Sequence, residues 1–80
     1  MAKFDCVFTR HTKARMKERR ISVEEVLSAI DHPDDVLIGR KGELNVFKTV
    51  GEGKRIRVVY VEEKNQRIFI TAMITDRTKE

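Results

Sequence analysis

The sequence predicts an α+β fold in which two N-terminal helices pack on one face of a four-stranded antiparallel meander sheet. Apolar residues follow a helical period of about 3.6 up to Pro33 and a period of two after it. A capping signal marks one helix, and turn residues separate the apolar stretches that follow. A chain of 80 residues has room for a single core, so we expect residues 1–80 to form one domain.

The second predicted helix begins after Ser22. Ser22 and Glu25 have the S-x-x-E spacing of a capping box, in which each side chain bonds the backbone N–H of the other residue. Pro33 ends the helix, because the residue before a proline avoids the helical region. The apolar side chains at helical spacing, which predict a stripe that faces the core, are Val23, Val26, Leu27 and Ile30.

The first predicted helix is more polar and runs from an N-cap at Thr9 to about Arg20. Thr12 and Met16 are expected to form its buried side. We therefore expect this helix to lie on the core rather than inside it.

Four strands are predicted over residues 36–40, 44–50, 56–62 and 67–75, with turns at 41–42, 51–53 and 64–66. In the last strand, alternation predicts that one set of side chains meets the helices, namely Ile68, Ile70, Ala72 and Ile74. The opposite set is Phe69, Thr71, Met73 and Thr75. We expect Arg57, Asn45 and Thr49 to join this second set on an uncovered face that is free to act as a working surface.

Positive charge is concentrated at the start of the chain. Residues 1–21 hold seven basic and two acidic side chains (+5), and the remaining 59 hold ten basic and eleven acidic ones (−1). His11, Arg15 and Arg19 recur at every fourth position, which places them on one stripe of the first helix. This pattern favours an anionic partner; the alternative is an ordinary solvated helix face.

Other features limit the function classes. A lone cysteine, Cys6, and no apolar run of about 18 residues indicate a cytoplasmic protein with no membrane association. His11 and His32 lack a spacing that suggests joint metal ligation, and no glycine-rich phosphate loop occurs. We therefore expect neither a metal nor a cofactor.

The motif Thr-Arg-His…Arg-Met…Glu-Arg…Ile-Ser-x-Glu-Glu-Val at residues 9–26, followed by four strands with a threonine late in the last one, resembles a known family. That family consists of small prokaryotic proteins known only as a domain of unknown function. It is grouped with the barnase–EndoU–colicin–RelE fold, which includes endoribonucleases of toxin–antitoxin pairs. The resemblance covers about residues 7–75 and implies a RelE-like domain with His11, Arg57 and Thr71 as its site residues.

These residues suit metal-independent RNA cleavage, which requires proton transfer and cations that stabilise the phosphorane. His11 is the candidate for proton transfer because imidazole titrates near neutrality. Arg57 and Arg15 would stabilise the phosphate and Thr71 would orient it. The RNA-binding candidates are Arg10, Lys13, Arg15, Arg19 and Tyr60.

Each candidate has a purely structural alternative. His11 would be a capping or packing histidine, Arg15 and Arg19 would pair with nearby acids such as Glu18 and Glu24, and Arg57 would be an ordinary exposed strand charge. Thr71 would be a packing threonine of a strand, and Tyr60 would fill the core. The leading hypothesis is an RNA-directed protein, an endoribonuclease of toxin type or its degenerate relative. The rivals are a non-catalytic RNA- or ribosome-binding module and a protein-interaction domain whose open face is covered by an antitoxin-like protein.

Overall fold

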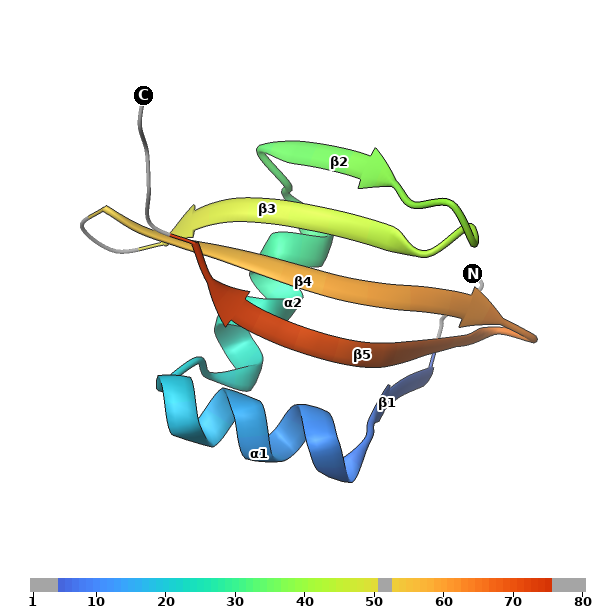
Figure 1. Cartoon of the computed structure of the whole chain (residues 1–80), viewed down its shortest axis with the longest axis horizontal. Coiled ribbons are helices and arrows are strands. Elements are labelled where there is room, and N and C mark those ends of the chain that lie inside the picture. The colour runs from blue at the N-terminus through green and yellow to red at the C-terminus, as the bar shows by residue number, and fades with distance from the viewer. Residues whose placement is uncertain (1–4, 51–52, 76–80) are drawn as a thin grey trace.

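The computed structural model describes residues 5–50 and 53–75, and it shows two helices and a five-stranded sheet (Figure 1). The elements, in chain order, are β1 (Asp5–Phe8), α1 (Arg10–Arg19), α2 (Val23–Asp31), β2 (Asp35–Ile38), β3 (Leu44–Val50), β4 (Lys54–Glu63) and β5 (Gln66–Ile74). The strand order is β1-β5-β4-β3-β2.

Strands β2 to β5 form the predicted antiparallel meander, but the prediction of four strands is wrong because β1 adds a fifth. β1 pairs in parallel with β5, from Asp5 opposite Gln66 to Phe8 opposite Phe69. Its four residues are too few to show an alternating pattern, and its partner lies at the other end of the chain. The bounds of the other strands agree with the predicted ones to within two residues.

Local capping confirms both predicted helix starts. The Thr9 hydroxyl accepts the backbone N–H of Thr12 at 3.1 Å. Ser22 and Glu25 complete the capping box, with both reciprocal hydrogen bonds at 3.0 Å. α1 ends at Arg19, and its C-cap Arg20 adopts the left-handed conformation (φ 56°) and turns the chain sharply toward α2.

The hairpin from β4 to β5 closes through Lys64 and Asn65, whose φ values of 48° and 66° give the two left-handed residues of a tight hairpin turn. The turn before β3 has Gly42 at φ 85°, and Gly53 precedes β4 at φ 79°. Residues 51 and 52 of the third predicted turn lie outside the described residues.

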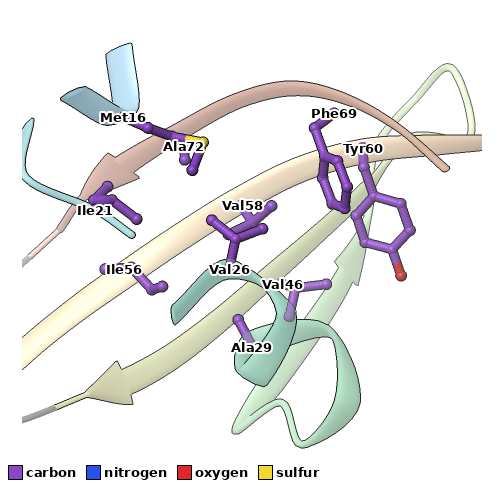
Figure 2. Packing of buried hydrophobic residues seen from close by; sticks show 10 residues of the cluster. All are labelled: Met16, Ile21, Val26, Ala29, Val46, Ile56, Val58, Tyr60, Phe69 and Ala72. Carbon is purple, nitrogen blue, oxygen red and sulfur yellow. The ribbon is translucent and has the colours of Figure 1, made fainter. Parts of the chain in front are cut away.

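The core lies between the sheet and the helices (Figure 2). Val26 and Ala29 of α2 pack against side chains of β3 and β4, and Met16 of α1 lies beside Ala72 of β5. Thr12 and Met16 are buried, as predicted, whereas Val23 is 48% exposed and does not belong to the core-facing stripe. The buried cluster is formed by Met16, Ile21, Val26, Ala29, Val46, Ile56, Val58, Tyr60, Phe69 and Ala72.

The predicted alternation in β5 is wrong in its first half because of a β-bulge. Tyr60 of β4 faces Phe69 and Val59 faces Thr71, so Ile70 has no partner in β4. One extra residue reverses the phase of a strand. Phe69 is therefore fully buried under the helices, whereas Ile70 is 43% exposed.

α1 lies along β5 and covers the outer edge of this strand beyond the end of β1 (Figure 1). The Thr12 hydroxyl donates to the carbonyl oxygen of Phe69 at 2.5 Å, and Arg19 Nη1 donates to the carbonyl oxygen of Ala72 at 3.0 Å. Side chains of a helix thus satisfy carbonyl groups that a further strand would otherwise bind.

Candidate nucleic-acid interface

The sheet has one face that the helices leave uncovered, and we call it the open face. Val46 and Val58 point toward the helices, so their neighbours along β3 and β4 point the other way. The cross-strand register places Asn45, Val59 and Thr71 in one row and Phe47, Arg57 and Met73 in the next. Thr49 and Arg55 form a third row. The structure thus brings Arg57, Thr71, Asn45 and Thr49 to one face, as predicted.

Arg57 is held in place by Asn45. Nε and Nη2 of Arg57 donate to Oδ1 of Asn45 at 3.1 and 2.7 Å. The Asn45 side chain is itself fixed, because it is 6% exposed and its Nδ2 donates to the carbonyl oxygen of Leu37 in β2 at 3.5 Å. The partner of Arg57 is a neutral amide, and within residues 5–50 and 53–75 no carboxylate forms an ion pair with it. Arg57 therefore keeps its full charge on the open face.

A second arginine lies close by. The guanidinium carbons of Arg55 and Arg57 lie 5.1 and 5.9 Å from the ring centre of Phe47, within the range of cation–π attraction. Arg55 also approaches Asp35 of β2, with Nη2 and Oδ2 3.6 Å apart. The carboxylate offsets part of the charge of Arg55, so Arg57 is the stronger anion-binding candidate of the two.

Thr71 is half-buried on the open face. It lies opposite Val59, while Arg57 lies opposite Met73, which makes Arg57 and Thr71 diagonal neighbours on adjacent strands. Such neighbours are roughly 7–8 Å apart at their Cα atoms. The guanidinium group of Arg57 is directed toward Asn45 in β3, whereas Thr71 lies in β5 on the other side of β4, so the two groups are spread across the open face.

The basic residues of α1 are placed in different ways. Arg10, His11 and Lys13 are exposed. Arg15 forms an exposed ion pair with Glu18 at 2.9 Å. Pairing with a nearby acid is the structural alternative given for Arg15 above. Arg19 is half-buried and uses Nη1 to bind Ala72.

No hydrogen bond or ion pair in the described parts of the chain joins these α1 side chains to Arg57 or Thr71. α1 is nevertheless anchored beside the strand that carries Thr71. Thr12 is bound at Phe69 and Arg19 at Ala72, so this part of the helix runs alongside residues 69–72.

Tyr60 does not belong to the candidate interface. It is 6% exposed on the helix side of the sheet, with its ring centre 5.6 Å from that of Phe69 (Figure 2). Burial raises the pKa of its phenol. The prediction that Tyr60 binds RNA is therefore wrong, and its alternative as a core residue is confirmed.

A titratable group with a shifted pKa lies beside the open face. Asp34 Oδ2 accepts the backbone N–H of Thr49 at 2.9 Å, and this hydrogen bond lowers the pKa of Asp34 with help from Lys48 and Arg55. His32 is the C-cap of α2, and its backbone N–H donates to Ser28.

The described residues contain no group of three or more metal-ligating side chains and no helix long enough to cross a membrane. Cys6 is a free, exposed thiol.

The sequence analysis did not predict that Asn45 holds Arg57, or that the guanidinium groups of Arg55 and Arg57 lie over the ring of Phe47. Alternation places these residues on the open face but does not reveal the register between strands. The register that places Phe47 opposite Arg57 and Asn45 opposite Val59 brings both the Phe47 ring and the Asn45 side chain within reach of Arg57.

A family model described as "Domain of unknown function (DUF4258)" matches residues 8–74. The chain belongs to this family. The DUF4258 match covers both helices, strands β2 to β5 and every candidate site residue, and it confirms the resemblance to a small uncharacterised domain. Neither the curated proteins nor the solved structures that were compared with the chain match it.

Proposed function

We propose that this DUF4258 protein is a cytoplasmic, RNA-directed protein of RelE-like fold that binds RNA on its open face and cleaves it as a metal-independent endoribonuclease. The observation that carries the proposal is the positioning of Arg57 by Asn45. A guanidinium group held by a neutral partner is oriented in advance and keeps its charge for a phosphate.

The remaining N–H groups of Arg57 can donate to a phosphate oxygen, and the Thr71 hydroxyl on the neighbouring strand can donate to another part of the same RNA strand. Both donors come from strands of a packed sheet, so their positions change little when substrate binds. Phe47 and the two guanidinium groups beside it offer flat surfaces on which an unpaired base can stack. Single-stranded RNA is therefore the expected ligand.

In the proposed reaction, neutral His11 removes the proton of the ribose 2′-hydroxyl. The 2′-oxygen then attacks the adjacent phosphorus, and the bond from phosphorus to the 5′-oxygen breaks. The imidazolium group returns the proton to the leaving 5′-oxygen, which leaves a 2′,3′-cyclic phosphate and a free 5′-hydroxyl. Arg57, with Arg15, would stabilise the charge that develops on the phosphorane.

The position of α1 along the edge of β5 supports this role for His11. His11 is exposed and lies about 140° around the helix from the buried Met16, whereas Arg15 lies about 100° from it. His11 also directly precedes Thr12, which is bound to β5 two residues before Thr71.

A second candidate is a non-catalytic RNA- or ribosome-binding module. The observation that favours it is that no hydrogen bond or ion pair links His11 to Arg57 or Thr71 in the described residues. The same cations would then bind the phosphate backbone without proton transfer. The open face is also the surface that an antitoxin-like protein would cover in a protein-interaction domain.

The experiment is incubation of the purified protein with bulk RNA in EDTA, followed by analysis of the RNA ends. Wild-type protein should produce 2′,3′-cyclic phosphate ends. His11→Ala should abolish cleavage while binding RNA as well as wild type does, and Arg57→Gln should impair both. His32→Ala is the matched control, because it removes the other exposed histidine, which lies at the end of α2.

Binding without cleavage by wild-type protein would support the non-catalytic module instead. Failure to bind RNA at all would overturn both RNA functions and leave the protein-interaction domain. Cleavage that persists in His11→Ala would remove His11 from the mechanism.

A further inference from the structure

The second feature that calls for a function is the free edge of the sheet at β2. Val36, Leu37 and Ile38 are 46%, 60% and 73% exposed, and they form three consecutive apolar residues on a strand that pairs only with β3. Proteins usually protect such edges with charged residues, proline or a covering element, because exposed apolar edge strands pair with other chains.

The opposite end of the sheet is protected in this way. There β1 covers the first part of β5, and α1 binds the carbonyl groups of Phe69 and Ala72. No side chain of Val36–Ile38 carries a charge, and no described element covers the outer side of β2. Both β1 and β2 are edge strands, and among the described residues β2 is the one that exposes three consecutive apolar side chains.

The backbone of β2 is arranged to accept another strand. Gly39 donates its N–H to the carbonyl oxygen of Glu43 at 2.8 Å, so residues at odd positions of β2 direct their hydrogen-bonding groups toward β3. Val36 and Ile38 therefore direct their N–H and C=O groups outward.

The charged residues on either side of β2 favour pairing with a second copy of the same segment. The acidic pair Asp34 and Asp35 precedes the three apolar residues, and the basic pair Arg40 and Lys41 follows them. When two copies of this segment run antiparallel, the acidic end of each copy lies beside the basic end of the other. In a parallel pairing, like charges would face each other.

We propose that the β2 edge is a self-association surface through which two copies of this chain pair antiparallel and join their sheets. Leu37 of one copy lies opposite Leu37 of the other on the twofold axis. Val36 of each copy then exchanges two backbone hydrogen bonds with Ile38 of the other, and the apolar side chains cover one another.

The interface is short, so the dimer forms reversibly and its population rises with protein concentration. The open-face residues Arg57 and Thr71 lie on strands β4 and β5, away from the new contact. The self-association proposal therefore does not rest on the proposed RNA function.

The test is sedimentation equilibrium over a wide range of protein concentration, with two charge variants. Asp35→Lys places a lysine beside Arg40 and Lys41 of the other copy. The double variant Arg40→Glu/Lys41→Glu places two glutamates beside Asp34 and Asp35 of the other copy. Each variant alone should dimerise at least about tenfold more weakly than wild type, because like charges now face each other at both ends.

An equimolar mixture of the two variants should restore dimerisation, because each end then joins opposite charges again. Restoration also requires both variants to be folded. The control, Lys13→Glu/Lys17→Glu on α1, makes the same change in net charge as Arg40→Glu/Lys41→Glu but away from β2, and it should dimerise like wild type. The proposal is overturned if wild type stays monomeric throughout, which would leave the edge to a different protein, or if the mixture remains monomeric.

Discussion

The guanidinium group of Arg57 and the side-chain amide of Asn45 form a two-point contact, with both Nε and Nη2 donating to the same oxygen. Asn45 is in turn held by the backbone of β2 at Leu37. Three strands therefore fix one arginine on the open face without neutralising its charge. This arrangement orients a cation and leaves its charge available, as an anion site requires.

Replacing Asn45 by aspartate tests the importance of the neutral partner. Asn45→Asp preserves an oxygen acceptor but places a carboxylate against Arg57, so we expect RNA binding to weaken by about tenfold at low salt. Asn45→Asp also loses the hydrogen bond that Nδ2 donates to Leu37, but the fold should persist because the half-buried arginine gains a charged partner. Fluorescence anisotropy with a single-stranded RNA measures the affinity, and thermal melting checks the fold. Unchanged affinity would show that RNA does not use Arg57.

The salt dependence of binding tests Arg57 itself. If Arg57 contacts one phosphate of single-stranded RNA, Arg57→Gln should reduce the slope of log K against log salt concentration by about 0.7. Arg55→Gln should reduce it less, because Asp35 already offsets part of the charge of Arg55. Arg40→Gln, which removes an exposed charge beyond β2, should leave the slope unchanged. Equal slopes for all four proteins would argue against a phosphate site on the open face.

The sequence predicted the elements whose signals are local. The capping box of Ser22 and Glu25 and the N-cap at Thr9 depend on side chains that bond a backbone N–H three residues away, and both formed as expected. β1 could not be predicted in this way, because its partner β5 lies about 60 residues away. The bulge at Ile70 was equally hidden, since an extra residue in one strand is visible only against its neighbour.

In the candidate site, too, the features with local signals were predicted and those that depend on pairing between strands were not. In the second half of β5, alternation correctly placed Thr71 and Met73 on the face of Arg57. Before the bulge the same alternation failed and assigned the buried Phe69 to the open face. The contact of Arg57 with Asn45 depends on the pairing of β3 with β4, which no pattern within a single strand specifies. Whether His11 acts with Arg57 stays a prediction.

The anchor between α1 and β5 gives a prediction about stability. Thr12 is 1% exposed, and its hydroxyl binds the carbonyl oxygen of Phe69, to which Thr9 also donates at 3.4 Å. Thr12→Val keeps the volume but removes the donor, so the free energy of unfolding should fall by about 1–3 kcal/mol. Urea denaturation measures the change. Thr49→Val is the control, because Thr49 is exposed and should change stability little.

The link between Asp34 and Thr49 predicts how stability depends on pH. The hydrogen bond from the Thr49 backbone lowers the pKa of Asp34 from its ordinary value of 3.8, and Lys48 lowers it further. A carboxyl whose pKa is lower in the folded state binds protons more readily when the chain is unfolded. Its stabilising effect is therefore fully present above about pH 5 and is lost as the pH falls through the folded-state pKa.

The comparison is between wild type, Asp34→Ala and Asp34→Asn. Wild type should melt at a higher temperature than Asp34→Ala at neutral pH, and the difference should shrink as the pH falls below about 4, where Asp34 of the unfolded chain binds a proton. Asp34→Asn cannot titrate but retains an oxygen that can accept the Thr49 N–H. Its melting temperature should therefore lie between the other two at neutral pH, and its advantage over Asp34→Ala should persist in acid. A gap between wild type and Asp34→Ala that stays constant into strong acid would show that the charge of Asp34 does not stabilise the junction of α2 with the sheet.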